Sequence, residues 1–331
     1  MKRNAVSLFV FLIILLPAVS SADVVHLRNG DRLSGTVLRK LNGLLTMKTD
    51  YAGKVAIKWE EVERIETTRP ITVLLRDDSV VEGTLFNGKE GDPPGTLALA
   101  DIRQVNPPPY LSGKGMEWRG RLNTGLNVSE GNNETKQVHL DGEIGVRSRQ
   151  NRFTVASVYH HARDGEAETE ANFAGSGKFD HFLSRQWYAS TRARYEKDRF
   201  KDLDLRSTYG LGGGYQFRES RLLNLAVEAG FNYVIEDHII GDNDEYPAAR
   251  WGFDYDQYFF GETLQLFHNH DLAIGLEDTE DILLQTKTGI RVPVWEKITA
   301  TLAVNFEWDN APSDDKGRTD TNYLMSLGYT W

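Results

Sequence analysis

The last nine residues, "YLMSLGYTW" (Tyr323–Trp331), alternate strictly between two kinds of side chain. The apolar side chains are those of Tyr323, Met325, Leu327, Tyr329 and Trp331, and smaller or more polar residues separate most of them. A period of two predicts a β-strand with one apolar face. Chain ends fray unless something ties them down. We therefore expect this strand to be held at Trp331 and to face apolar surroundings.

The same alternation recurs from residue 116 to the end of the chain, in about twelve segments of about 10–15 residues each. In "LLNLAVEAGFNYV" (222–234), for example, Val227 and Phe231 lie on one face, and Glu228 and Asn232 lie on the other. Even strand numbers are typical of single-chain bacterial barrels. The pattern predicts an all-β fold with a transmembrane, antiparallel, up-and-down β-barrel over residues 116–331.

The connectors that follow odd-numbered segments differ in length and charge from those that follow even-numbered segments. After odd segments they are long or acidic, as in "RDGEAETE" (163–170) and "IEDHIIGDNDEY" (235–246), and after even segments they are short, as in "RQN" (149–151). Long external loops and short periplasmic turns give this pattern in outer-membrane barrels. Aromatic residues near both ends of the segments predict two interfacial girdles. We expect both ends of the barrel domain to face the periplasm.

Three stretches resemble a known family: "LGGGYQF" (211–217), "LAVEAGFNY" (225–233) and "ATLAVNFEWDNAPSDDKGRTDTNYLMSLGYTW" (300–331). Over residues 116–331 the chain is similar to domain of unknown function 481, which comprises putative salt-induced outer-membrane proteins. The resemblance implies an outer-membrane barrel and a link to salt or osmotic stress, but no reaction or ligand. Such barrels usually end in Phe, whereas this chain ends in Trp331.

The aromatic end of the chain implies partners in biogenesis. We expect it to act as the carboxyl-terminal signal for the barrel assembly machinery, and outer-membrane lipid and lipopolysaccharide to surround the folded barrel. The residues of this predicted assembly signal are Tyr323, Leu327, Tyr329 and Trp331.

The amino-terminal third predicts export and a separate small domain. Residues 1–22 have two early basic residues, an apolar run too short to span a bilayer, and small residues before a cleavage point, which predicts a signal peptide. Residues 107–115 contain "PPPY" and glycines and predict a linker. The chain has no cysteine, so an exported protein of this kind cannot be a disulfide scaffold.

Between these segments, residues 23–106 contain an internal repeat. "VVHLRNGDRLSGTV" (24–37) resembles "ITVLLRDDSVVEGTL" (71–85), and each is typical of a strand, a tight turn and a second strand. We predict tandem small β-barrel modules of the SH3 or Sm-like kind that lie in the periplasm. They would act either as a spacer or, as an alternative function of the protein, in docking or adhesion to a periplasmic partner. Sm-like barrels can bind RNA, but the net charge of −10 disfavours nucleic acid as a partner.

Charged residues on the polar face of the segments are the candidates for a functional site. They mix both signs, so the predicted lumen is either a narrow charged pore or an interior filled by ion pairs. The arginines of the first and fifth segments could also make one wall positive and favour anions. The predicted lumen residues are Arg119, Arg121, Asp141, Glu143, Arg192, Arg194, Arg206, Glu228, Arg250, Asp254, Lys287, Arg291 and Glu307.

Histidines raise the alternative of an outer-membrane enzyme, such as a lipase or protease. The candidates for a base or a metal ligand are His160, His161, His181, His268 and His270. The sequence pairs no nucleophile with a base in a recognisable arrangement. We therefore predict no catalytic residue, no cofactor and no metal site, and a structural or passive pore-forming role. The oligomeric state stays open.

Overall fold

The computed structural model describes residues 22–331, except for 42, 87–96, 130–134 and 313–316. The predicted signal peptide lies outside the described residues, apart from Ala22. The chain divides into two compact units, one ending at Ser112 and one beginning at Gly113. No helix in the described part is both long and apolar enough to cross a membrane.

The first unit is a small β-structure. Its elements are β1 (Asp23–Leu27), β2 (Arg32–Leu41), β3 (Leu44–Thr49), β4 (Gly53–Lys58), η1 (Trp59–Glu61), β5 (Val62–Leu75), β6 (Val80–Phe86), η2 (Leu99–Asp101), β7 (Ile102–Val105) and α1 (Pro109–Ser112). Strands β1, β5, β7 and β2 pair in a closed circuit. Strand β6 adds to β5, and β3 and β4 extend the sheet from β2.

The two sequence repeats form one unit. Strand β5 contains the end of the first repeat and the start of the second, pairing with β1 through Val62–Glu66 and with β7 through Val73–Leu75. One core combines Val25 and Met47 of the first repeat with Phe86 of the second. The prediction of tandem modules is therefore corrected to a single small barrel with one shared core, because neither repeat encloses a core of its own.

The predicted linker is also shorter than expected. Residues Pro109–Ser112 form the helical turn α1, and Tyr110 within it is buried. An aromatic side chain of this size contributes strongly to packing when it is buried. The chain up to Ser112 therefore belongs to the first unit, whereas the sequence predicted a linker over residues 107–115.

Lys40 gives this unit a testable pH dependence. Its ammonium donates a hydrogen bond to the Ile102 carbonyl at 2.5 Å and lies 4.0 Å from the centroid of the Trp59 ring. Burial, together with the nearby Arg76 guanidinium, lowers the pKa of Lys40 to about 8. Between about pH 8 and the ordinary value of 10.5, the unfolded chain keeps a proton that the folded chain has lost.

The free energy of unfolding of the first unit should therefore rise as the pH increases through that window, by up to about 3 kcal/mol. Urea unfolding of the full chain, followed by a single thiol probe introduced with Val37→Cys in the buried core, measures it. The same chain with Lys40→Met is the control and should lack this part of the rise. An equal rise in both proteins would show that the lowered pKa of Lys40 is not its cause.

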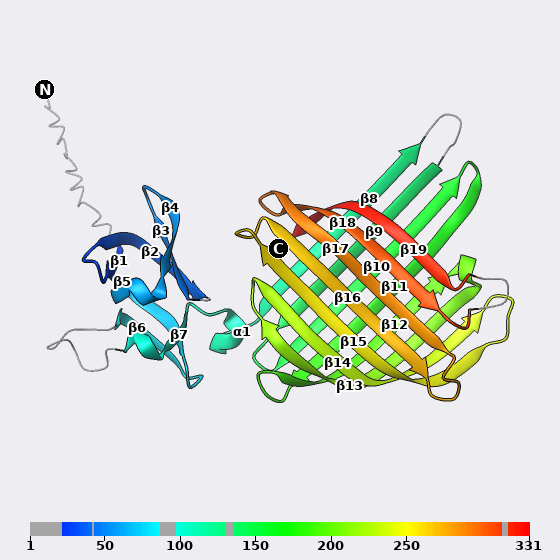
Figure 1. Cartoon of the computed structure of the whole chain (residues 1–331). Coiled ribbons are helices and arrows are strands. Elements are labelled where there is room, and N and C mark those ends of the chain that lie inside the picture. Colours follow the sequence, from blue (N-terminus) through cyan, green and yellow to red (C-terminus); the bar gives the residue numbers. More distant parts are fainter. Residues whose placement is uncertain (1–21, 42, 87–96, 130–134, 313–316) are drawn as a thin grey trace, which may run out of the picture. The chain divides into compact units, whose positions relative to one another are not determined.

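The second unit is a closed antiparallel barrel of twelve strands, as the sequence predicted (Figure 1). Its strands are β8 (Glu117–Ser129), β9 (Thr135–Arg147), β10 (Asn151–Asp164), β11 (Ala167–Phe182), β12 (Trp187–Asp198), β13 (Leu203–Glu219), β14 (Leu223–His238), β15 (Asp244–Phe259), β16 (Leu264–Gly275), β17 (Ile282–Trp295), β18 (Ile298–Asp309) and β19 (Thr319–Thr330). The short helix η3 (Arg199–Lys201) joins β12 to β13.

The connectors at the two ends of the barrel differ in length less than the sequence predicted. The stretch "RDGEAETE" is mostly strand, because β10 continues to Asp164 and β11 starts at Ala167. Only Gly165 and Glu166 remain as the turn, and Gly165 adopts a φ of 60°, which suits glycine. The connectors that lie wholly within the described residues are six residues or shorter.

The barrel closes where its last strand meets its first. Residues Leu327–Thr330 of β19 pair with Arg121–Thr124 of β8. Beyond them, Gly120 and Trp331 exchange two backbone hydrogen bonds of 3.1 Å. A Cβ at Gly120 would overlap the Trp331 ring, so glycine is required for this close approach. The carboxyl terminus is thus held by backbone pairing, as the alternation in the last nine residues led us to expect.

Candidate functional site: a barrel interior crossed by ion pairs

Strand register separates the two faces of the barrel wall. One row of directly paired residues runs from β12 to β19 and is mostly polar: Tyr188, Gly214, Glu228, Gly252, Asp271, Gln285, Glu307 and Asp320. The adjacent row, one residue earlier or later on each strand, is mostly apolar: Trp187, Tyr215, Val227, Phe253, His270, Thr286, Phe306 and Thr321. The first row faces inward, because its charged groups pair with strands that are not their neighbours.

All of the predicted lumen residues lie at inward-facing register positions. Their environments differ widely. Glu228 is 2% exposed and Arg291 is 5% exposed, whereas half of the Arg119 side chain is accessible. The interior therefore contains deeply buried charges as well as charges near an opening.

The structure does not support one positive wall. Arg119 and Arg121 lie on β8, where Arg119 pairs with Glu117 at 2.8 Å and Arg121 pairs with Glu143 at 3.2 Å. On β12, Arg194 pairs with Glu196 at 2.6 Å. Each of these arginines has its own carboxylate partner. The predicted cluster is thus wrong, because β8 and β12 are not neighbours and local acids offset each positive charge.

The ion pairs of Lys201 join distant parts of the wall. Its ammonium, on η3, lies 2.6 Å from a Glu307 oxygen on β18 and 2.8 Å from an Asp320 oxygen on β19. Between β13, which follows η3, and β18 there are four strands in one direction and six in the other. Arg206 of β13 also approaches Asp309 of β18, at 3.9 Å. These contacts bridge nearly opposite sides of the barrel.

Lys201 keeps its charge over the physiological range. Burial acts to lower the pKa of its ammonium, and the carboxylates of Glu307 and Asp320 outweigh burial, so that the pKa lies above its ordinary value. A lysine held between two carboxylates remains protonated and continues to attract both of them. Protonation of Lys201 therefore does not limit the bridge across this end of the barrel at neutral pH.

Further ion pairs cross the interior at other levels. Near the opposite end, Arg147 of β9 donates to Glu219 of β13 at 3.0 Å, and its guanidinium lies 3.7 Å from the centroid of the Phe182 ring. Three more pairs join strands with two or three strands between them. They are Arg192 with Asp271 at 2.5 Å, Lys287 with Asp141 at 3.6 Å, and Lys178 with Glu228.

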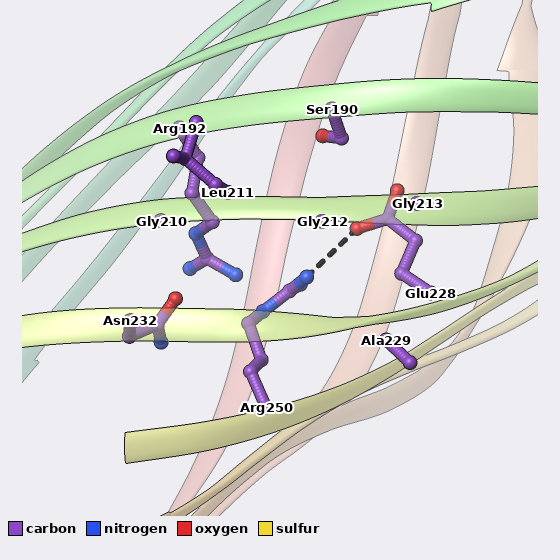
Figure 2. Close-up of a pocket in the computed structure, with 10 residues that line it drawn as sticks. All are labelled: Ser190, Arg192, Gly210, Leu211, Gly212, Gly213, Glu228, Ala229, Asn232 and Arg250. Carbon is purple, nitrogen blue, oxygen red and sulfur yellow. Dashed lines mark hydrogen bonds and ion pairs between the residues drawn. The ribbon is translucent and has the colours of Figure 1, made fainter. Parts of the chain in front are cut away.

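Glycines in the inner wall make room for this network. Gly210 and Gly212 of β13 line a space of about 10 Å³, which is enough for about one water molecule. Figure 2 shows the side chains of Arg192 and Arg250 pointing into this space, with Arg250 donating to Glu228 at 2.9 Å. The inward-facing Gly210 and Gly212 therefore leave room for the long side chains of Arg192 and Arg250.

Two of the histidine candidates face away from the interior. His268 and His270 of β16 occupy outward positions, and a chain of hydrogen bonds connects them. Trp251 donates to His270 at 3.0 Å, the two rings meet at 3.2 Å, and His268 reaches the Thr288 hydroxyl at 2.7 Å. Because the indole can only donate, each ring in turn accepts on one nitrogen and donates from the other. This chain satisfies both imidazoles in their neutral form.

The other histidine candidates are spread over the barrel. His161 faces outward on β10 and contacts Glu168 at 3.0 Å, and His181 lies 2.8 Å from the side chain of Asn151. His160 faces inward, opposite His139. Within the described residues, no group of three or more His, Cys, Asp or Glu side chains could hold a metal ion.

The barrel sequence matches a family model. Residues 122–331 match the family described as "Protein of unknown function, DUF481". The chain belongs to the DUF481 family. The resemblance read from the three sequence stretches is thus confirmed, whereas the likeness of the first unit to Sm-like barrels stays a prediction. No curated protein matches the sequence.

Solved barrels are similar to this DUF481 protein at a low level. The translocator domain of autotransporter NalP from Neisseria meningitidis is 13% identical, with a TM-score of 0.36, over 66% of this chain and 88% of that one. The NanC porin is 11% identical, with a TM-score of 0.37, over 65% and 97%. The outer membrane channel DcaP of Acinetobacter baumannii is 11% identical, with a TM-score of 0.31, over 94% of each chain.

Several members of the DUF481 protein's interior network, among them Asp271 and Lys201, lie outside the set of predicted lumen residues. Asp271 follows from the alternation in β16, because His268, His270 and Leu272 occupy the other face. Lys201 lies in a connector, where no periodic pattern shows the direction of a side chain. Its two partners also lie more than 100 positions away in the sequence.

Proposed function

We propose that this protein is a structural outer-membrane barrel whose interior is closed at rest by ion pairs. A membrane location is supported by the outward face, where Leu126, Leu211, Phe231 and Tyr323 are 65–79% exposed. Aliphatic and aromatic side chains exposed on this scale around a closed barrel suit hydrocarbon surroundings. Water would strongly disfavour the same surface.

The observation that carries the structural role is the bridge from Lys201 to Glu307 and Asp320. A pore needs a continuous polar path, whereas charged pairs here cross the interior at both ends and in the middle. A buried charge that loses its partner is strongly unfavourable, so each crossing pair also stabilises the wall. The network therefore supports a closed scaffold better than an open pore.

The arrangement of strands supports the expected orientation. With twelve strands, β8 starts and β19 finishes at the same end of the barrel. All connectors at that end have two to four residues, whereas the other end carries the longer connectors 239–243 and 276–281 beside the two-residue turn 165–166. Short turns are typical of the periplasmic side. We place residues 23–112 in the periplasm, where they would dock a partner, with lipid and lipopolysaccharide around the barrel.

Salt could act on such an interior directly. Raising the ionic strength weakens ion pairs that water can reach, and it affects buried ones less. Glu143 and Asp320 have side chains that are 41% and 61% exposed, so their pairs should weaken first. We propose that high salt loosens this network, which would connect the barrel to salt or osmotic stress as a passive, non-enzymatic response.

Planar-bilayer conductance of the purified full chain tests the closed interior. The wild type should be nearly silent in about 0.15 M KCl and should conduct more than in proportion to salt towards about 1 M, as the screening length falls from about 8 Å to about 3 Å. A variant with Arg147→Ala, Arg192→Ala and Lys201→Ala should conduct already at low salt, because each of its three changes removes a crossing pair.

Lys197→Ala is the matched control, because Lys197 pairs with Asp204 at 3.4 Å through side chains that are more than half exposed. This variant should remain silent. A large, steady conductance in the wild type that the triple variant does not change would refute the closed scaffold and favour the passive pore. Phospholipid or peptide hydrolysis by the wild type would favour the enzyme alternative.

A further inference from the structure

The junction between β8 and β19 leaves one strand edge free. The ladder between these strands ends at Thr124 and Leu327, although β8 continues to Ser129 and β19 begins at Thr319. In Figure 1, the two strands diverge from this short ladder. Within the described residues, positions 319–326 of β19 therefore pair with β18 alone, and the edge that they turn towards β8 has no strand partner.

A free edge of this kind needs polar neighbours. Backbone N–H and C=O groups that face hydrocarbon without a partner are strongly unfavourable, so open sheet edges do not border plain lipid chains. Tyr323 and Met325 lie on the same segment and are 79% and 78% exposed on its outward side, so the space beside the edge is also apolar. A molecule that lies there must combine hydrogen-bonding groups with apolar surface.

An apolar groove of about 440 Å³ reaches this segment across the outward face of β16, β17 and β18. Its volume falls within the range of about 300–1,000 Å³ that is typical of small-molecule sites. Gly289 and Ala303 occupy inward positions, so the floor of the groove is backbone. The side chains along it belong to two outward rows, which are Leu266, Ile290, Leu302 and Met325 in one row, and Thr288, Val304 and Tyr323 in the other.

Thr288 brings a hydroxyl group into this groove. The chain of hydrogen bonds from Trp251 through His270 and His268 ends at this hydroxyl, and its direction is fixed because an indole can only donate. The Thr288 oxygen therefore accepts from His268 and keeps its own hydrogen to donate. Among the described residues, that hydrogen has no acceptor, so an oxygen atom on an apolar ligand would satisfy it.

The positions of these groups along the barrel indicate how a ligand would lie. Strands β17 and β19 both run from the end with the longer connectors towards the end with the short turns. The row of Thr288 and Tyr323 is therefore nearer the outer end than the row of Ile290 and Met325, and the free edge extends further outward still. A lipid of the outer leaflet would place its polar part along the edge and its chain in the groove.

We propose that the groove and the free edge of β19 together bind one lipopolysaccharide molecule of the outer leaflet. Lipopolysaccharide has the required groups, because some of its acyl chains are joined through amides and carry hydroxyl or ester oxygens near the head. Phospholipid chains have oxygen only where they join the head. One chain fills the groove, Thr288 donates to an oxygen of that chain, and the amide and hydroxyl groups pair with the backbone of 319–326. The site requires the membrane location and the orientation that we propose for the barrel.

Native mass spectrometry of the full-length protein, refolded in detergent without lipid, tests this site with purified lipid A. We expect one lipid A molecule to bind, more tightly than phosphatidylethanolamine. Thr288→Val should weaken this binding about three- to tenfold, the usual effect of losing one hydrogen bond. Thr286→Val is the matched control and should bind like the wild type, because Thr286 is an outward threonine of the same strand that does not line the groove.

Thiol reactivity shows where the lipid lies. Met325 lines the groove and Leu211 lies on the outward face of β13, and the two residues are 78% and 70% exposed. Lipid A should slow the reaction of Met325→Cys with a maleimide severalfold and leave that of Leu211→Cys unchanged.

The proposal is overturned if lipid A does not bind, if it binds no better than phosphatidylethanolamine, if the two threonine variants bind alike, or if both thiols are protected equally. None of these results depends on conductance, so the closed interior would stand. Failure of the protein to insert into lipid bilayers would instead refute the proposed function and this site together.

Discussion

Deletion of Tyr329–Trp331 should leave the protein without a folded barrel. The junction between β8 and β19 has only four directly paired positions, together with the two hydrogen bonds between Gly120 and Trp331. By contrast, β18 and β19 pair at eleven positions. The deletion removes half of the paired positions and both hydrogen bonds. A barrel edge left open in lipid has unpaired backbone groups that cost several kcal/mol each.

Refolding of the purified chain into detergent micelles, followed by the heat-dependent shift of the barrel on a gel, measures this effect without the assembly machinery. Trp331→Phe is the control and should fold, because it keeps the backbone hydrogen bonds and an aromatic ring. If the deleted chain refolds as well as the wild type, the junction is not what holds the terminus. A defect seen only in cells would then assign residues 329–331 to the assembly signal.

Glu228→Gln should destabilise the barrel by about 3–5 kcal/mol, the usual effect of removing one partner of a buried ion pair. Glu228 accepts hydrogen bonds from the Tyr188 hydroxyl at 2.8 Å and from Arg250 at 2.9 Å, and it also contacts Lys178. The neutral amide keeps the shape of the side chain but leaves two buried cations without this negative charge. The loss of folded barrel with increasing guanidinium measures the effect.

Glu143→Gln is the matched control inside the same barrel. The Glu143 side chain is 41% exposed and contacts Arg121 at 3.2 Å. Water screens such a pair, so the change should cost no more than about 1 kcal/mol. Similar losses for Glu143→Gln and Glu228→Gln would contradict the claim that the crossing pairs of the interior carry the stability.

Strand alternation was enough to predict the barrel and the inward side of its wall, because a period of two fixes the direction of each side chain. It gave Glu228 and Arg250 the correct face, and it identified Trp331 as the end of a paired strand. Side-chain partners could not be predicted in the same way. Arg192 meets Asp271, a residue 79 positions later in the sequence, and the distance around the barrel decides this pairing.

In the first unit, the sequence could not predict how the two repeats pack together. Its repeats do correspond to similar strand patterns, but β5 continues through the boundary between them and joins both to one core. A repeat in sequence cannot tell whether two copies pack separately or combine. The meeting of His139 and His160 was also out of reach, because it depends on the register between β9 and β10.

The most direct test of the closed interior is a cross-link between opposite walls. The chain has no cysteine, so Lys201→Cys and Glu307→Cys introduce a unique pair of thiols. In membranes, a short bifunctional maleimide should join them within one chain and shift its migration on a denaturing gel. The control pair Lys201→Cys with Phe306→Cys places the second thiol on the outward row and should not react. Failure of the first pair to cross-link, or equal cross-linking of both pairs, would contradict the bridge across the barrel.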